Sequence, residues 1–209
     1  MGPTGPILVS GPLRALNLHC RTGRTLVTRA ALRRLPPGSP RFVMTDLAIA
    51  IRPELPADGD AIDRLHERAF GPGRFARSAY LLRERAPALP ELSFVACVGS
   101  LLVGSVRVSP VDAGGVPALV LGPLAVEPAF EKRGIGAALM ERTLEEARRA
   151  GHTLVILVGD EPYYARFGFH RIPPGRLTLP GPVDPARFLA VELAPGALDG
   201  AAGRVTAPR

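Results

Sequence analysis

The stretch "EPAFEKRGIGAALMERTLEEARRAG", residues 127–151, joins a loop with two closely spaced glycines to a segment rich in Glu and Arg. Apolar residues recur at helical spacing through the segment, which predicts an amphipathic helix lying on a sheet. Gly151 predicts the end of that helix. The face expected to be buried holds Gly136, Leu139, Met140, Thr143, Leu144 and Ala147, and the exposed face holds Glu141, Arg142, Glu145, Arg148 and Arg149.

The start of this helix has the features of an anion-binding site. Gly134 and Gly136 remove side chains at the point where the free N–H groups of the first turn face outward. Lys132 and Arg133 add positive charge to the positive end of the helix dipole. A ligand that carries phosphate would fit there. The alternative is that the two glycines only permit close packing of the helix on a strand.

Two other phosphate-binding motifs do not match. A dinucleotide fingerprint needs G-x-G-x-x-G/A directly after a strand, followed by an acidic residue about twenty positions later. Asp160 has a suitable spacing, but Leu139 occupies the third glycine position and a loop separates Val126 from Gly134. A Walker-type loop needs Gly-Lys-Ser/Thr, which the sequence lacks.

The composition is that of one globular domain. The chain has 209 residues, 46% of them apolar, and contains no apolar run long enough to span a bilayer. No signal peptide is recognisable, and Cys20 and Cys97 lack the spacing of a metal site. We therefore expect a soluble cytoplasmic protein with no membrane partner and no metal; a homodimer stays open.

The net charge of +7 is confined to the N-terminal segment. Residues 1–45 contain seven arginines and no acidic residue, whereas the rest of the chain has 19 basic and 19 acidic residues. A neutral domain gives no reason to expect specific nucleic-acid binding. The segment is open to three interpretations: a disordered arm that binds polyanions, an organelle transit peptide, or a non-functional extension that ends near Met44. The change of composition at "VMTDLAIAIRP" favours the third.

We expect residues 1–45 to be a disordered extension, residues 46–194 to form the domain, and residues 195–209 to be a C-terminal tail that frays beyond Leu193. Gly99-Ser100 predicts a hairpin turn, and Pro123 predicts a bulge or an edge in its strand. The expected elements, in chain order, are a strand at 47–53, helices at 57–70 and 75–86, strands at 93–98, 101–109 and 116–126, the helix described above, a strand at 153–158, a short helix leading into a strand at 162–169, and a last strand at 187–193.

Two motifs in the same order resemble the GCN5-related N-acetyltransferase (GNAT) family. The first is "LGPLAVEPAFEKRGIGAALM", a strand, a loop and a helix that opens with x-x-G-x-G. The second is "GDEPYYARFGF", which fits the G-D-x-x-Y-Y-x-R-F-G-F pattern of a bacterial branch of these proteins. The resemblance extends from about Ile49 to Val205 and excludes the first 45 residues.

The resemblance implies a single α/β domain with a mixed, mostly antiparallel sheet flanked by helices, whose central strands splay apart around acetyl-CoA. The resemblance implies acetyl-CoA as a cosubstrate and an amine-bearing acceptor as the second partner. It implies no metal. Backbone groups of one strand would bind the pantetheine arm, and the following loop and helix start would hold the pyrophosphate. The residues carried over for these roles are Leu124, Ala125, Val126, Glu131, Lys132, Arg133, Gly134, Ile135, Gly136 and Ala137.

The resemblance also implies that Tyr164 is the general acid that protonates the departing thiolate. The alternative is a core aromatic residue. The sequence departs from the family at Glu131, where Gln or Arg is usual, and the central strand carries no carboxylate to act as a base. Glu127, Asp160 and Glu161 lie near the expected site but are more typical of loop and cap residues, so no base is assigned.

The sequence thus predicts an acetyl-CoA-dependent N-acetyltransferase with an unidentified acceptor. A non-catalytic module that binds acetyl-CoA is the alternative. Arg74 and Arg77 are candidates for contact with an anionic group of the acceptor, with a solvated surface as the competing explanation.

Overall fold

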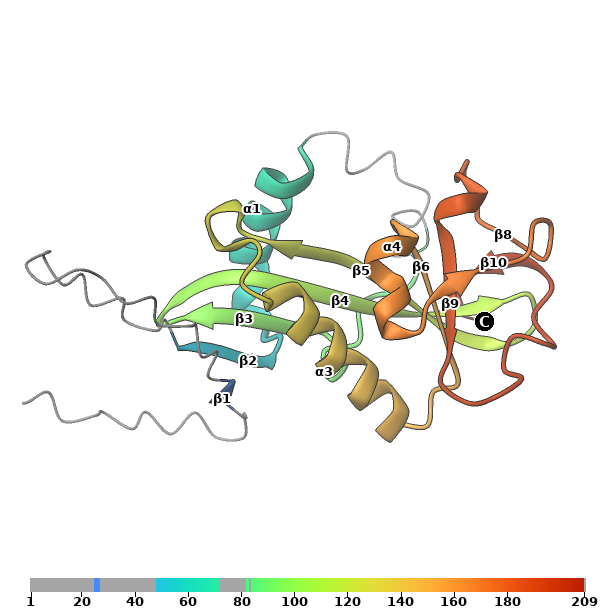
Figure 1. The fold of residues 1–209 in the computed structure, drawn as a ribbon, viewed down its shortest axis with the longest axis horizontal. Helices are drawn as coiled ribbons and strands as arrows, with labels where there is room; N and C mark the ends of the chain where they lie inside the picture. Colours follow the sequence, from blue (N-terminus) through green and yellow to red (C-terminus); the bar gives the residue numbers. More distant parts are fainter. Residues whose placement is uncertain (1–24, 27–47, 72–81, 83, 209) are drawn as a thin grey trace, which may run out of the picture.

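The computed structural model describes residues 25–26, 48–71, 82 and 84–208. The chain forms one extended mixed sheet with helices on both faces (Figure 1). Its strands are β1 (Thr25–Leu26), β2 (Ile49–Pro53), β3 (Phe94–Val98), β4 (Leu101–Ala113), β5 (Pro117–Val126), β6 (Leu154–Val158), β7 (His170–Arg171), β8 (Leu177–Thr178), β9 (Phe188–Glu192) and β10 (Gly203–Thr206). The helices are α1 (Gly59–Phe70), α3 (Ile135–Arg149) and α4 (Glu161–Tyr164), and short 3₁₀ turns lie at Pro56–Asp58, Pro128–Phe130, Ala165–Phe167 and Pro185–Arg187.

The main sheet has the order β1-β2-β3-β4-β5-β6-β9-β7. Neighbouring strands along this path are antiparallel except β5 and β6, which are parallel because α3 connects them as a crossover. The hairpin predicted at Gly99-Ser100 joins β3 to β4, and Gly99 has a positive φ of 58°. The mixed, mostly antiparallel sheet expected from the sequence is confirmed.

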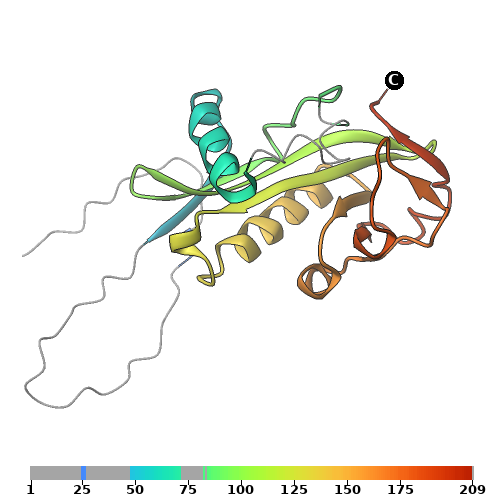
Figure 2. The same cartoon turned by 90° about the horizontal axis from the view of Figure 1, so that it is seen from above.

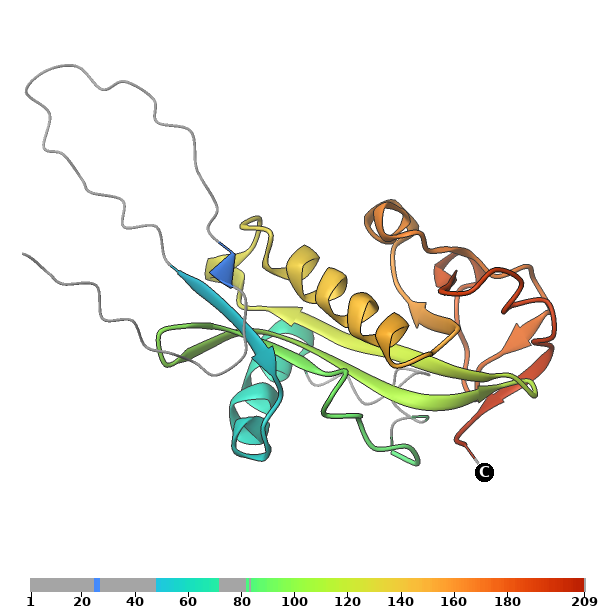
Figure 3. The ribbon, with the colours of Figure 1, turned by 90° about the horizontal axis from the view of Figure 1, so that it is seen from below.

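The helices form two layers. Figures 2 and 3 show α1 on one face of the sheet and α3 on the other, with α4 on the same side as α3. The amphipathic prediction for α3 holds, since its buried residues are Ile135, Leu139, Met140, Thr143, Leu144 and Ala147. These side chains pack on alternate residues of the strands, among them Val155 and Leu157 of β6.

The opposite face of the sheet carries two further apolar clusters. Ile62 and Leu65 of α1 pack near Ala125 of β5. Nearer the C-terminus, Ile156 of β6 and Phe188 of β9 belong to a separate buried cluster. Neighbouring residues along β6 and β9 therefore alternate between the α3 side and this second side.

Asp58 comes directly before α1, but its carboxylate does not cap that helix. It accepts hydrogen bonds from Arg52 at 2.6 and 2.7 Å and from the backbone N–H of Leu55 at 2.8 Å. The hydrogen bonds from Arg52 are the main reason that the pKa of Asp58 lies below its usual value. The carboxylate ties β2 to the turn that leads into α1.

The C-terminal residues are not frayed, contrary to the expectation for the chain beyond Leu193. β10 pairs with β4 through Val205 and Ala113, and with β8 through Gly203 and Leu177. Val205 is fully buried. Apolar contacts with strands distant in sequence hold this Ala/Gly-rich segment, and no local pattern in the sequence signals them.

Most of the basic N-terminal segment and of the helix expected at 75–86 lies outside the described residues, as do Arg74 and Arg77. Within the segment, β1 pairs with β2, Thr25 lying opposite Ala50. No helix in the described part of the chain has the length and apolar character needed to cross a membrane.

Candidate active site

Strands β5 and β6 part in the middle of the sheet. Their parallel pairing consists of Leu119 with Val155 and Val120 with Ile156, yet β5 continues to Val126. On its other edge β5 stays paired with β4 as far as Gly104 and Val126. Beyond Val120, the edge of β5 that faces β6 therefore has no strand partner in the described structure. Such an edge can pair with an extended ligand through its backbone groups.

The parting coincides with an irregularity in β5. The register between β4 and β5 shifts between Val106 and Val108, opposite the segment that contains Gly122 and Pro123. Gly122 has a φ of 126°, which favours glycine, and the peptide bond to Pro123 is cis. The bulge or edge predicted at Pro123 is thus present as a bulge. Bulges bend a strand and re-aim its backbone groups.

The first turn of α3 faces the same region with unused N–H groups. Gly134 precedes the helix with a φ of 81°, and no side chain caps it. The first backbone donor is Ala138, which bonds to the carbonyl of Gly134 at 3.0 Å; the amides of residues 132–137 donate no hydrogen bond within the described part of the chain. Lys132 and Arg133 are exposed beside them. The arrangement has the polarity of an anion-binding helix start.

Close packing of helix on strand does not explain the glycine at position 134. A β-carbon on Gly134 would meet nothing within 4 Å, so its positive φ is the feature that favours glycine. The close approach between α3 and the sheet occurs at Gly104 of β4, where a β-carbon would lie 2.9 Å from the Ile135 side chain. Gly136 differs from both, because a β-carbon there would lie 2.7 Å from the hydroxyl of Tyr163.

Tyr163 connects α4 to the start of α3. Its hydroxyl approaches Gly136, while its ring makes an edge contact with Tyr164 at 4.9 Å between centroids. The guanidinium of Arg166 lies over the Tyr163 ring, 4.2 Å from its centroid. No local pattern in the sequence signals this contact, because it joins residues 27 positions apart in the chain.

Tyr164 is held where β6 ends. Its ring packs so closely on Gly159 that a β-carbon at Gly159 would lie 2.2 Å from Cε2. It also makes an edge contact with Phe169, 5.9 Å between centroids. The phenol makes no hydrogen bond within the described residues. The fully buried side-chain polar atoms without a partner in that part of the chain are Ser109 Oγ and Thr143 Oγ1, and the Tyr164 hydroxyl is not one of them.

Burial raises the pKa of Tyr164 to about 12, with smaller contributions in the same direction from Tyr163 and Asp160 and an opposing one from Arg187. The phenol therefore keeps its proton throughout the physiological pH range. A protonated hydroxyl in a largely apolar setting can donate a hydrogen bond or a proton to a developing anion.

The three carboxylates considered as a base are all ion-paired. Glu127 contacts Arg68 at 2.8 Å, Asp160 contacts Arg187 at 3.1 Å, and Glu161 contacts Arg171 at 2.6 Å. Each pair supports a structural role for its carboxylate. No cluster of three or more potential metal ligands is present among the described residues.

A buried polar contact that the sequence did not suggest holds α1 against the sheet. His66 Nε2 lies 2.9 Å from Ser105 Oγ, and both side chains are buried. Ser105 pairs with Ala125 on β5, so this contact lies behind the strand whose free edge lines the opening.

The structure brings the predicted site residues into one region. Leu124, Ala125 and Val126 end β5; Glu131, Lys132, Arg133 and Gly134 form the loop; Ile135, Gly136 and Ala137 begin α3; and Tyr164 ends α4. The Ala125 and Ile135 side chains are buried, which leaves their backbone groups for a ligand, whereas Glu131 is exposed to solvent.

Comparisons with known proteins agree with this geometry. The model of the acetyltransferase (GNAT) family matches residues 60–169, more than half of the chain. The uncharacterized N-acetyltransferase YhbS of Escherichia coli K12 is 32% identical over 158 residues, which cover 74% of this chain and 93% of that protein.

Two solved structures show the same fold at appreciable sequence identity. YhbS from Escherichia coli in complex with CoA superposes with a TM-score of 0.67 at 29% identity, over 80% of this chain and 94% of that one. A GNAT acetyltransferase from Brucella melitensis in complex with acetyl-CoA gives a TM-score of 0.55 at 32% identity, over 70% of this chain and 89% of that one. The parted strands, the glycine-rich helix start and these likenesses together show that the chain belongs to the GNAT family of N-acetyltransferases.

Proposed function

We propose that this N-acetyltransferase uses acetyl-CoA and transfers its acetyl group to the amine of an acceptor. The observation that carries the proposal is the meeting of three features at one opening: the free edge of β5, the unused amides at the start of α3, and the Tyr164 phenol. The CoA and acetyl-CoA complexes of the two relatives support the choice of cosubstrate.

In this proposal the pantetheine arm pairs with Leu124, Ala125 and Val126 as an added strand. The pyrophosphate lies on the amides of residues 133–137, with Lys132 and Arg133 contributing charge. Since the contacts are made by backbone groups, the exposed Glu131 can point its carboxylate into solvent.

The chemistry is an acyl transfer. The amine nitrogen attacks the thioester carbonyl carbon, the C–S bond breaks, and the sulfur leaves as a thiolate that takes the Tyr164 proton. The nitrogen loses its extra proton to water, and the phenolate recovers a proton from solvent. Because burial raises its pKa to about 12, the Tyr164 phenol carries its proton at neutral pH before the amine attacks.

In this proposal the catalytic unit extends from residue 46 through β10, whose Val205 is buried, and the basic residues 1–45 are not needed for CoA binding. A chain that begins at Met44 should keep the CoA affinity of the full protein, whereas a large loss would assign the extension a role. The cytoplasmic location and the absence of a metal or nucleic-acid requirement expected from the sequence belong to the same proposal.

Thiol release from acetyl-CoA, followed with a thiol-reactive dye over a panel of primary amines, tests the proposed activity. We expect release above the amine-free control with at least one amine, together with formation of the acetamide by mass spectrometry. Tight CoA binding by calorimetry without turnover on any amine would favour the alternative of a non-catalytic module.

A further inference from the structure

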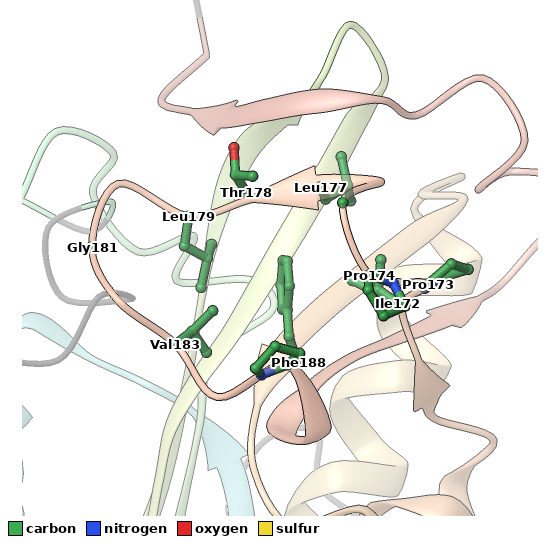
Figure 4. Close-up of a pocket in the computed structure, with 11 residues that line it drawn as sticks. Ile172, Pro173, Pro174, Leu177, Thr178, Leu179, Gly181, Val183 and Phe188 are labelled. Atoms are coloured by element: carbon green, nitrogen blue, oxygen red, sulfur yellow. The ribbon is translucent and has the colours of Figure 1, made fainter.

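An apolar hollow lies beside β8 and β9, and its lining residue Phe188 is on the side of β9 that faces away from α3. Its volume is about 320 Å³, and eleven residues of the segment 172–188 line it (Figure 4). The lining includes Ile172, Leu177, Leu179, Val183 and Phe188. Among the described residues that line it, Thr178 is the one with a polar side chain, and none is charged. Pockets of this size and apolar character typically bind part of a small organic molecule.

Two backbone contacts join the pocket wall to the end of β6, next to the point where β5 and β6 part. Phe188 pairs with Val158, the last residue of β6, and the N–H of Gly159 bonds to the carbonyl of Arg187 at 2.9 Å. Phe188 also shares a buried cluster with Val120 and Ile156, the last pair that joins β5 to β6. The pocket wall thus ends where the strands part.

Hydrogen bonds within the protein hold the pocket in shape without a ligand. Ile172 N–H bonds to the Phe188 carbonyl at 3.0 Å, which closes the loop at its base. The Arg176 guanidinium donates to the carbonyls of Leu198 and Asp199, both at 2.6 Å, and to that of Ala201 at 3.1 Å. These bonds, with the pairing of β8 and β10, fix the loop against the C-terminal segment. A preformed pocket binds with less loss of entropy than a mobile one.

From this geometry we propose that the pocket holds the apolar body of the amine acceptor while its amino group reaches the thioester through the opening. The inference rests on the proposed acetyl transfer and names its substrate class: primary amines with a branched alkyl or aryl group close to the nitrogen. CoA is an unsuitable occupant, because the lining residues of this pocket carry no charge, whereas the start of α3 offers free amides and the exposed Lys132 and Arg133 to its phosphates.

The test compares phenethylamine and isopentylamine with ethanolamine and putrescine, which are polar amines, in two separate measurements. One is kcat/KM with saturating acetyl-CoA. The other is calorimetric binding of the amine to the protein saturated with CoA, which needs no turnover. We expect both measurements to favour the apolar amines, by about tenfold or more.

Val183→Trp probes the pocket directly, since Val183 is half-buried and lines it. The variant should raise KM for phenethylamine by about tenfold or more and leave ethanolamine unchanged. Ala186→Trp is the matched control, because Ala186 is exposed in the same loop and does not line the pocket. Val183→Ala should act in the opposite direction and shift preference toward bulkier aryl amines, which keeps the test valid if the Trp variant fails to fold.

Equal binding of apolar and polar amines, or equal effects of Val183→Trp and Ala186→Trp, would overturn the pocket assignment. Apolar amines that bind the CoA complex in a Val183-dependent way but are never acetylated would instead overturn the proposed activity and leave the pocket assignment standing. The two failures are therefore distinguishable.

Discussion

The hydroxyl oxygen of Tyr163 lies 2.7 Å from the position that a β-carbon on Gly136 would occupy. The glycine in the first turn of α3 is thus matched to a tyrosine of α4, across the opening in which acetyl-CoA is proposed to bind. The other atoms nearest to that β-carbon, Val126 Cγ2 at 3.7 Å and Tyr163 Cζ at 3.9 Å, leave ordinary van der Waals space. The hydroxyl alone is the obstacle.

The first prediction follows from this contact. Gly136→Ala should weaken CoA binding because the tyrosine must move, and Gly136→Ala combined with Tyr163→Phe should recover most of the loss because the obstructing oxygen is gone. Calorimetry on the four proteins of this cycle gives the coupling between the two positions. Additive effects would show that the alanine disturbs the amides of the helix start by another route.

The second prediction concerns the anion site. Gly134→Asp should weaken CoA by about tenfold or more and leave pantetheine, which lacks the pyrophosphate, nearly unaffected, because the added carboxylate repels phosphate. Gly151→Asp is a matched control: both glycines have φ near 80° (81° and 82°), and neither has an atom within 4 Å of the added β-carbon. Equal weakening of CoA by both variants would mean that backbone strain, and not charge at the helix start, causes the loss.

The third prediction concerns Tyr164. Tyr164→Phe preserves the ring contacts with Gly159 and Phe169 and removes only the hydroxyl. Turnover should fall by about a hundredfold, as for other lost acid–base groups, with CoA affinity nearly unchanged. Tyr163→Phe should lower turnover far less. Wild-type turnover by Tyr164→Phe would make this tyrosine a core residue and assign the proton to water.

The fourth prediction concerns pH. The pKa of Tyr164 is about 12 in the folded protein and about 10 in the unfolded chain, so the unfolded state loses its proton first. The stability that this group contributes is complete below pH 10 and is lost as the pH rises from about 10 to about 12. The difference in free energy of unfolding between wild type and Tyr164→Phe, from urea titrations, should shift across this range in the direction that destabilises the wild type. A difference independent of pH would show that Tyr164 titrates normally.

The fifth prediction concerns the hydrogen bonds by which Arg176 holds the C-terminal segment. Arg176→Ala removes hydrogen bonds to three backbone carbonyls and should lower the free energy of unfolding by about 1–3 kcal/mol. CoA affinity should be unchanged, because Arg176 lies away from the start of α3. The selectivity between phenethylamine and ethanolamine should fall, because the pocket loop loses its support. Arg204→Ala, another arginine at this end of the chain, is the control. Unchanged stability would mean that pairing of β8, β10 and β4 holds the segment without Arg176.

Much of the fold was evident from local patterns in the sequence. The 3.6-residue spacing of apolar residues identified the buried face of α3, since that periodicity alone determines which side chains share a helix face. Gly99-Ser100 marked the hairpin between β3 and β4 for a similarly local reason, namely the backbone conformation of a two-residue turn. The order of the two motifs then indicated the family to which the chain belongs.

Contacts between segments far apart in the chain were decided by the tertiary structure. The sequence did not reveal that Tyr163 meets Gly136, that β10 completes the sheet beside β4, or that Arg176 bonds its loop to residues 198–201. No residue spacing encodes such contacts, because they depend on how the strands twist and part once the whole core has packed. The sequence therefore determined the elements and the chemistry available at the helix start, while the packing of β5, β6 and the C-terminal segment decided the shape of the opening and of the pocket beside it.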